Sequence, residues 1–247
     1  DEHLLVINKN AGMPTVSTRS SKDGAREKSV YSLLTDYMHT EKRANIKEGT
    51  GDYRSSSRVF VVHRLDRDTS GLIVFAKDEY TKNLMQSKWD EMVLERRYTA
   101  VVEGHIDRKE GRIESWLTEN EKSLKMSSSP VDDGGMHAVT RFRVLEENRK
   151  FTWISFELET GRKNQIRVHM QDLGHPVVGD PKYGIADMYV PNPLGRLCLH
   201  AYRLFFYHPV TGERMEFETP IPTPFKQLVN NKYKPSADEA EAQSDEI

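Results

Sequence analysis

The sequence has a single cysteine, Cys198, among its 247 residues. One cysteine cannot form an intrachain disulfide, so we expect the protein to work in a reducing compartment, the cytoplasm. The chain also lacks any apolar run near the roughly 18 to 20 residues that a helix needs to cross a bilayer. No charged and then apolar segment of the signal-peptide kind opens it. We therefore expect a soluble protein that does not bind membranes.

Sequence motifs for common cofactors and metals are missing as well. The chain has neither a Walker loop nor a Rossmann glycine fingerprint, so we expect no nucleotide cofactor. His63, His169, His175 and His200 show no His-Glu-x-x-His spacing, and there is no Cys-x-x-Cys pair. A lone Cys198 near His200 is more often a core residue than a metal ligand. We expect no metal site.

A basic excess typical of nucleic-acid-binding proteins is also missing, because the formal net charge is −2. Residues 236–247 hold five acidic side chains and no Lys or Arg, so the rest of the chain carries +3. A net charge this small decides little, since local clustering matters more. We expect the acidic tail to be disordered.

One stretch carries the strongest functional signal, residues 61–77, VVHRLDRDTSGLIVFAK. Apolar β-formers lead into charged residues and a Thr-Ser-Gly turn, after which a strand pattern resumes. Asp66, flanked by Arg64 and Arg67, is therefore held between two predicted strands, where catalytic groups tend to lie. On these residues alone, an Asp that only caps a turn beside solvated arginines is the more frequent case.

The sequence of residues 63–72, HRLDxxTSGL, resembles the signature of RNA pseudouridine synthases of the ribosomal large-subunit type. The resemblance implies that Asp66 is the essential catalytic residue. Further blocks resemble family motifs in family order: LLVINKNAGMP at 4–14, ERRYTAVVEG at 95–104, LETGRKNQIRVH at 158–169, GHPVVGDPKYG at 174–184 and LCLHA at 197–201. By the same resemblance, Tyr98 is the active-site tyrosine and Arg167 pairs with the catalytic Asp.

These residue types suit the isomerisation that the resemblance implies. Asp66 would act at C1′ as base or nucleophile, and Arg167 would lower the pKa of that carboxyl. Tyr98 offers a ring to stack on the freed uracil and a hydroxyl for proton transfer at C5. The substrate would be a structured rRNA or tRNA stem-loop, bound by a monomer that needs no cofactor.

Five basic residues are assigned to RNA binding. Arg64 and Arg67 flank the catalytic loop, and Arg64 is a candidate wedge for an extruded base, with a surface ion pair as the alternative. Arg162, Lys163 and Lys182 are candidates for phosphate contacts, although basic side chains in loops more often face water. Lys163 stands, with its neighbour Asn164, where the family more usually has Thr-His.

The pattern of elements favours an α+β fold. Strands are predicted at 3–8, 98–102, 112–117, 138–145, 151–158, 199–207 and 214–218, the last two as a hairpin, and helices at 29–38, 79–92 and 165–173. Strands outnumber helices without alternating regularly. The resembled family agrees, since its fold is a largely antiparallel mixed sheet with a central active-site cleft and flanking helices. We expect residues 1–235 to form this one catalytic domain.

Two polar segments are expected to be loops. Residues 40–58 are predicted as a solvated loop, with a basic flap over RNA phosphates as the alternative. Residues 119–135, rich in Ser, Gly and charge, are predicted as a mobile loop and second as an RNA contact.

Two other functions compete with the enzyme. One is a non-catalytic RNA-binding or ribosome-assembly factor on the same fold, in which Asp66 is a turn residue. The other is a carboxylate glycosidase, which would need a second carboxyl about 5 to 10 Å from the first. Asp68 lies too close in the same turn to serve as that partner.

Overall fold

The computed structural model describes residues 1–17, 27–47, 58–184 and 194–230. Its strands are β1 (Leu4–Lys9), β2 (Phe60–Val61), β3 (Ser70–Ala76), β4 (Val93–Glu103), β5 (Glu110–Glu119), β6 (Met126–Ser129), β7 (Met136–Glu147), β8 (Phe151–Leu158), β9 (Leu199–Tyr207) and β10 (Arg214–Glu218). Its helices are α1 (Val30–Lys47), α2 (Glu79–Ser87), α3 (Trp89–Met92), α4 (Gln165–Asp172) and α5 (Thr223–Val229). The acidic tail at 236–247 lies outside the described residues.

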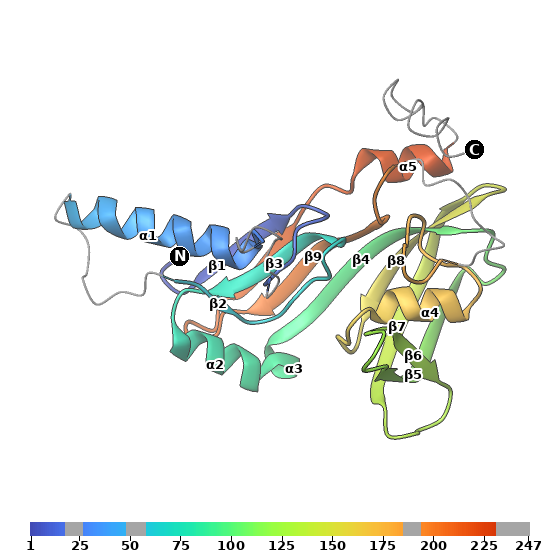
Figure 1. The fold of residues 1–247 in the computed structure, drawn as a ribbon, viewed down its shortest axis with the longest axis horizontal. Helices are drawn as coiled ribbons and strands as arrows, with labels where there is room; N and C mark the ends of the chain where they lie inside the picture. Colours follow the sequence, from blue (N-terminus) through green and yellow to red (C-terminus); the bar gives the residue numbers. More distant parts are fainter. Residues whose placement is uncertain (18–26, 48–57, 185–193, 231–247) are drawn as a thin grey trace. The chain divides into compact units, whose positions relative to one another are not determined.

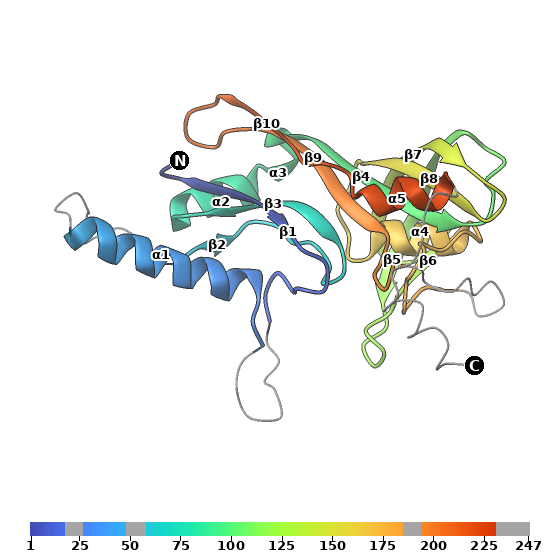
Figure 2. The same ribbon diagram turned by 90° about the horizontal axis from the view of Figure 1, so that it is seen from above.

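The strands follow the order β1-β3-β9-β4-β8-β7-β5-β6, with β2 beside β3 and β10 beside β9. The strand pairs with a described register are antiparallel. The β9–β10 hairpin, predicted with these bounds, is seen best in Figure 2. A largely antiparallel mixed sheet with flanking helices confirms the expected α+β fold, while the central cleft stays a prediction.

The chain divides into two compact units (Figure 1). Unit 1 comprises residues 1–94 and 204–219, and unit 2 comprises residues 95–203 and 220–247. β4 and β9 each continue from one unit into the other along the chain. The expectation of a single catalytic domain over residues 1–235 stays a prediction.

Unit 1 is built on β3, whose residues are all buried. β3 pairs with β1 along the whole length of β1, and the core includes Val74 from β3, Leu4 from β1 and Met85 from α2. α2 begins at its N-cap Asp78, whose side chain accepts hydrogen bonds from the backbone N–H and hydroxyl of Thr81, both at 2.7 Å. Such capping satisfies N–H groups that lack a partner inside the helix.

The single helix predicted at 79–92 is wrong in one respect, because Lys88 interrupts it. The φ and ψ of Lys88 are −119° and 26°, outside the helical region, so α2 ends at Ser87 and α3 begins at Trp89. Apolar spacing continues across the break, and it therefore could not reveal it.

Unit 2 is built on β4, β8, β7 and β5. Along β8 the side chains alternate, and Ile154 and Phe156 face a core that also contains Ile166 and Met170 of α4. α4 thus covers one face of this sheet, beside β6, β7 and β8 in Figure 1. α5, which the sequence did not predict, buries Phe225 in the same core.

The two predicted polar loops contain regular structure. α1 has 18 residues and continues through 40–47, so the loop prediction is wrong there, and residues 48–57 lie outside the described part. Glu, Lys and Arg are good helix formers, and an exposed helix needs few apolar residues. β6 lies within the predicted loop 119–135 and pairs with β5. No described helix has the length and hydropathy to span a membrane.

Candidate active site

The connection from β2 to β3 in unit 1 carries Asp66, which is partly buried. The Asp66 carbonyl accepts a hydrogen bond from Thr69 N at 3.2 Å, which closes a turn. This turn comes earlier than the predicted Thr-Ser-Gly turn, because Ser70 and Gly71 already belong to β3. Leu65 is buried, and its carbonyl oxygen and N–H bond the Thr15 hydroxyl at 2.9 and 3.3 Å. The backbone on the N-terminal side of Asp66 is thus fixed to the opening segment of the chain.

Lys9, the last residue of β1, is hydrogen-bonded to this loop. Only 2% of the Lys9 surface is exposed. Its Nζ donates to the carbonyl oxygens of Asn10, Met13 and Arg67 at 2.9, 2.9 and 2.8 Å. One buried ammonium therefore ties the 10–14 turn to the residue that follows Asp66. Sequence reasoning placed Lys9 in a family block but gave it no role, since carbonyl geometry leaves no signal in the sequence.

The neighbours of Asp66 differ in their surroundings. Arg64 is exposed, as a residue that reaches RNA would be. Arg67 forms a two-pronged ion pair with Glu27, in which Nη2 lies 2.9 Å from Oε2. His63 accepts a hydrogen bond from Val74 N at 3.1 Å, and its ring lies 4.9 Å from that of Trp89. His63 therefore supports the loop, and RNA binding by the two arginines stays a prediction.

Tyr98 and Arg167 belong to unit 2. Tyr98 lies opposite Phe156 in the β4–β8 pair and packs partly buried against the unit 2 core. Arg167 is on α4 and is only 5% exposed. Its Nε and Nη2 donate to the two carboxylate oxygens of Asp180 at 2.7 and 2.6 Å. Whether Asp66 meets Arg167 and Tyr98, as the resemblance implies, stays a prediction.

A tyrosine completes the surroundings of Arg167. The guanidinium carbon lies 5.1 Å from the centre of the buried Tyr183 ring. The Tyr183 hydroxyl accepts from Met126 N at 2.9 Å and donates to Asn164 Oδ1 at 3.1 Å. Asn164 precedes α4 with a left-handed φ of 54°, a conformation that Asn tolerates better than most residues. Sequence reasoning assigned no role to Asp180 or Tyr183.

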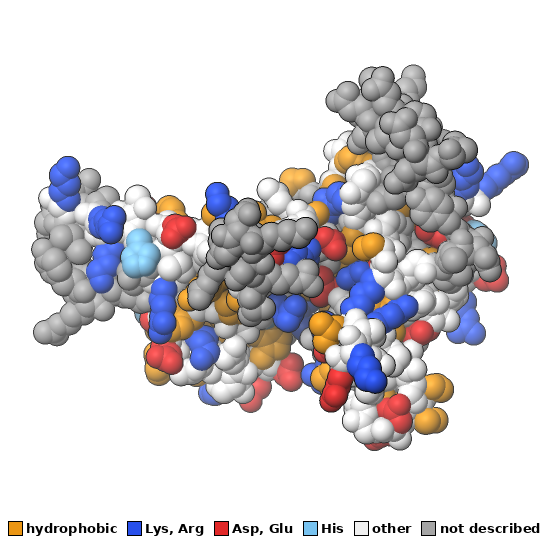
Figure 3. All heavy atoms as spheres, in the orientation of Figure 1, with side chains coloured by type: hydrophobic (Ala, Val, Ile, Leu, Met, Phe, Trp, Pro, Cys, Tyr) orange, Lys and Arg blue, Asp and Glu red, His pale blue; other side chains and the backbone are white. Residues whose placement is uncertain are grey.

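The other predicted RNA contacts lie around α4 and the 180–184 turn. Arg162 is exposed and donates from Nε to the His137 carbonyl at 2.9 Å. Lys163 pairs with Glu119, and the Lys182 ammonium donates to the Leu124 carbonyl. Figure 3 shows further Lys and Arg side chains over α1, mixed with acidic ones. All three of these predicted RNA contacts thus have partners within the protein, and phosphate binding stays a prediction.

Two buried histidines in unit 2 are not arranged as metal ligands. Both His169 nitrogens are used, by the Ser115 and Thr140 hydroxyls at 2.9 Å each. Burial lowers the pKa of His169 and of His200 to about 4. Burial raises the pKa of the Cys198 thiol to about 12, so it stays protonated. Within the described ranges, no group of three or more His, Cys, Asp or Glu side chains could hold a metal ion.

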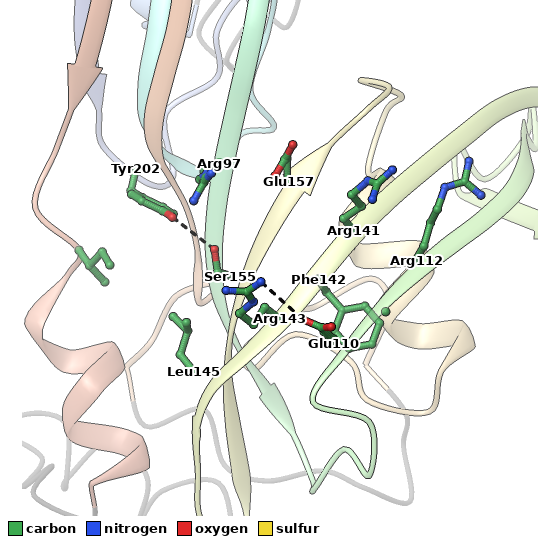
Figure 4. Close-up of a pocket in the computed structure, with 12 residues that line it drawn as sticks. Arg97, Glu110, Arg112, Arg141, Phe142, Arg143, Leu145, Ser155, Glu157 and Tyr202 are labelled. Atoms are coloured by element: carbon green, nitrogen blue, oxygen red, sulfur yellow. Dashed lines mark hydrogen bonds and ion pairs between the residues drawn. The ribbon is translucent and has the colours of Figure 1, made fainter.

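Unit 2 also has an open cavity of about 750 Å³ (Figure 4). Its charged lining residues are Arg97, Glu110, Arg112, Arg141, Arg143 and Glu157. Several pair with carboxylates, such as Arg141 with Glu159 at 2.5 Å and Arg143 with Glu110 at 3.5 Å. Arg97 precedes Tyr98 in β4, so the two side chains point to opposite faces of the sheet. The cavity is therefore an ion-paired surface away from Tyr98, and we assign it no substrate.

Comparison with known proteins agrees with these features. A model of the RNA pseudouridylate synthase family matches residues 3–172, a range that includes Asp66, Tyr98 and Arg167. YjbO of Bacillus subtilis, described as an uncharacterized RNA pseudouridine synthase, is 35% identical over 232 residues, covering 94% of this chain and 74% of YjbO. Ribosomal large subunit pseudouridine synthase D of Pseudomonas aeruginosa is 35% identical over 241 residues, covering 93% and 69%.

Solved structures show the same fold. Human RNA pseudouridylate synthase domain containing 4 superposes with a TM-score of 0.68 at 21% identity, covering 96% of this chain and 93% of that one. Human RNA pseudouridylate synthase domain containing 1 superposes with a TM-score of 0.65 at 23% identity, covering 98% of this chain and 91% of that one. The fold thus agrees, and the family match over residues 3–172 with the 35% identity to YjbO shows that the chain belongs to the RNA pseudouridylate synthase family.

Proposed function

We propose that the chain converts uridine to pseudouridine in RNA with Asp66 as the catalytic carboxylate. The observation that carries the proposal is the HRLDxxTSGL block itself, whose residues 63–69 form a loop that contains Asp66 and is anchored by Lys9 and Thr15. A carboxylate that acts on a sugar carbon must be held in a reproducible position, because small misplacements are costly. The buried contacts on both sides of Asp66 supply that rigidity.

The reaction breaks the C1′–N1 bond, turns the base and joins C1′ to C5, after which C5 loses its proton and N1, no longer bonded to C1′, carries one. It is an isomerisation, so no group has to be supplied by a cofactor. Asp66 acts at C1′, and Arg167 keeps its carboxyl ionised because an opposite charge favours the charged form. Tyr98 offers its ring to the uracil and its hydroxyl to the proton at C5.

The proposed substrate is a structured RNA that presents its uridine in a loop. Extruding a base costs a few kcal/mol, and a base that is already unpaired costs least. The relative from Pseudomonas aeruginosa is named for the large ribosomal subunit, which favours rRNA over tRNA. Arg64, Arg162 and Lys182 would hold phosphates outside the target nucleotide, the contacts that position a nucleic acid.

The experiment compares isomerisation of a stem-loop RNA, its isolated loop strand and UMP at two salt concentrations. We expect turnover of the stem-loop, slower turnover of the loop strand and none of UMP. Stem-loop affinity should fall steeply with salt, because released counterions drive phosphate binding. Comparable turnover of UMP, or an affinity for the stem-loop RNA that does not change with salt concentration, would contradict the RNA proposal and favour a small-molecule glycosidase.

A further inference from the structure

The Arg167–Asp180 pair is unusual in its burial. The side chain of Arg167 is 6% exposed and that of Asp180 is fully buried. A buried ion pair rarely stabilises a protein more than apolar side chains of the same volume would, because both charges lose their hydration. The pair therefore calls for a reason other than stability.

Asp180 cannot reach a substrate, since its side chain is fully buried and its hydrogen bonds go to Arg167 and to the backbone of the 180–183 turn. Oδ2 accepts from Arg167 Nε, and Oδ1 accepts from Arg167 Nη2 and from the backbone N–H groups of Lys182 and Tyr183 at 2.9 and 3.0 Å. These bonds engage both oxygens and fix the carboxylate to the 180–183 turn. Any effect of Asp180 on chemistry has to pass through Arg167.

Asp180 occupies one edge of the guanidinium and no more. An arginine has five N–H groups, and the Nε and Nη2 bonds use two of them. Two parallel bonds of this kind fix the plane of the guanidinium as well as its distance. The Tyr183 ring at 5.1 Å restrains the same group from its face, and Asn164 and Met126 hold the Tyr183 hydroxyl. The Arg167 guanidinium is thereby held in one orientation.

We propose that Asp180 is a positioning residue that orients Arg167 toward a second carboxylate, that of Asp66, with Tyr183 and Asn164 as its support. The proposal rests on the proposed function, in which Arg167 acts beside Asp66. It also gives Asn164 a role. The family more usually has His at this position. Here the Asn164 backbone is left-handed, and its side chain accepts a hydrogen bond from the Tyr183 hydroxyl.

The test measures tritium release from stem-loop RNA labelled at uridine C5. Asp180→Asn keeps the volume and removes the charge, while Asp180→Glu keeps the charge and moves the carboxylate by one methylene. We expect both variants to lower kcat about 100-fold, as misplacement of a reacting group by 1 Å does, and to leave KM within about twofold, because Asp180 makes no RNA contact. Phe225→Leu in α5 is the control for lost stability, and we expect it to lower the melting temperature without lowering kcat at 25 °C.

A double-variant comparison separates positioning from a structural role. If Asp180 acts through Arg167, Asp180→Asn should cost nothing further once Arg167→Gln is present, so the double variant should have the kcat of Arg167→Gln. Wild-type kcat in either Asp180 variant, independent effects that multiply, or failure of both variants to fold would overturn the inference. Wild-type kcat in Arg167→Gln would instead overturn the proposed function on which the inference rests.

Discussion

Acidification should destabilise unit 2 through His169, because this side chain is buried in its neutral form. None of the His169 surface is exposed, and each ring nitrogen bonds a hydroxyl, of Ser115 or of Thr140. Burial lowers its pKa from 6.5 to about 4. The unfolded chain binds the proton more readily, so stability is fully present above pH 6.5 and is lost as the pH falls toward 4.

The size of the effect follows from the two pKa values. Between pH 7 and pH 4.5, a histidine with a pKa of 6.5 unfolded and about 4 folded costs about 2 to 3 kcal/mol of stability. Other groups titrate in this range too: burial raises the pKa of Glu103 to about 7, which acts with the opposite sign. The informative quantity is therefore the difference between the wild type and His169→Gln, which cannot take up the proton.

The assay is urea unfolding at pH 7 and pH 4.5, followed by tryptophan fluorescence. The chain has three Trp residues, and a Trp89→Phe background leaves Trp116 and Trp153, both in unit 2. We expect acidification to cost His169→Gln about 2 to 3 kcal/mol less than it costs the wild type, while the exposed control His137→Gln should follow the wild type. Equal losses in His169→Gln and the wild type, within about 0.5 kcal/mol, would refute the reasoning.

Three further predictions concern the catalytic loop, the tyrosine and metals. Lys9→Met should lower the free energy of unfolding by about 2 to 4 kcal/mol, because it leaves buried carbonyls without a donor, and should lower kcat; Lys77→Met, which loses one exposed bond to Asp1, is the control, and equal stability of the two variants would contradict the prediction. Tyr98→Phe should bind RNA and lose turnover while Tyr98→Ala loses both, and a fully active Phe variant would reduce Tyr98 to a packing residue. Turnover should persist in excess chelator, and activity that disappears and returns with zinc would contradict a metal-free reaction.

Local sequence pattern predicted those elements whose side chains alternate between core and solvent. β8 at Phe151–Leu158 and the β9–β10 hairpin have the predicted bounds. β6 was missed because its Met-Ser-Ser-Ser sequence has little strand preference, and pairing with β5 decides its conformation. The end of α1 was missed because exposed helical turns show no apolar periodicity.

Candidate site residues could be named from the sequence where a motif contains them, but not where burial alone creates their contacts. Asp66, Tyr98 and Arg167 came from a resemblance, and the family match over residues 3–172 supports that resemblance. Asp180 lies 13 residues from Arg167, and no spacing rule joins a helix residue to the following turn. Lys9 acts through three backbone carbonyls, which no side-chain pattern reports.

The most direct test of the central claim is the substitution Asp66→Asn, which removes the charge with almost no change in volume. Tritium release from stem-loop RNA labelled at uridine C5 should fall to background, while the Kd for the same RNA should stay within about twofold because Asp66 makes no phosphate contact. Release at the wild-type rate by a folded Asp66→Asn variant would remove Asp66 from the mechanism and leave the non-catalytic RNA-binding factor as the better account.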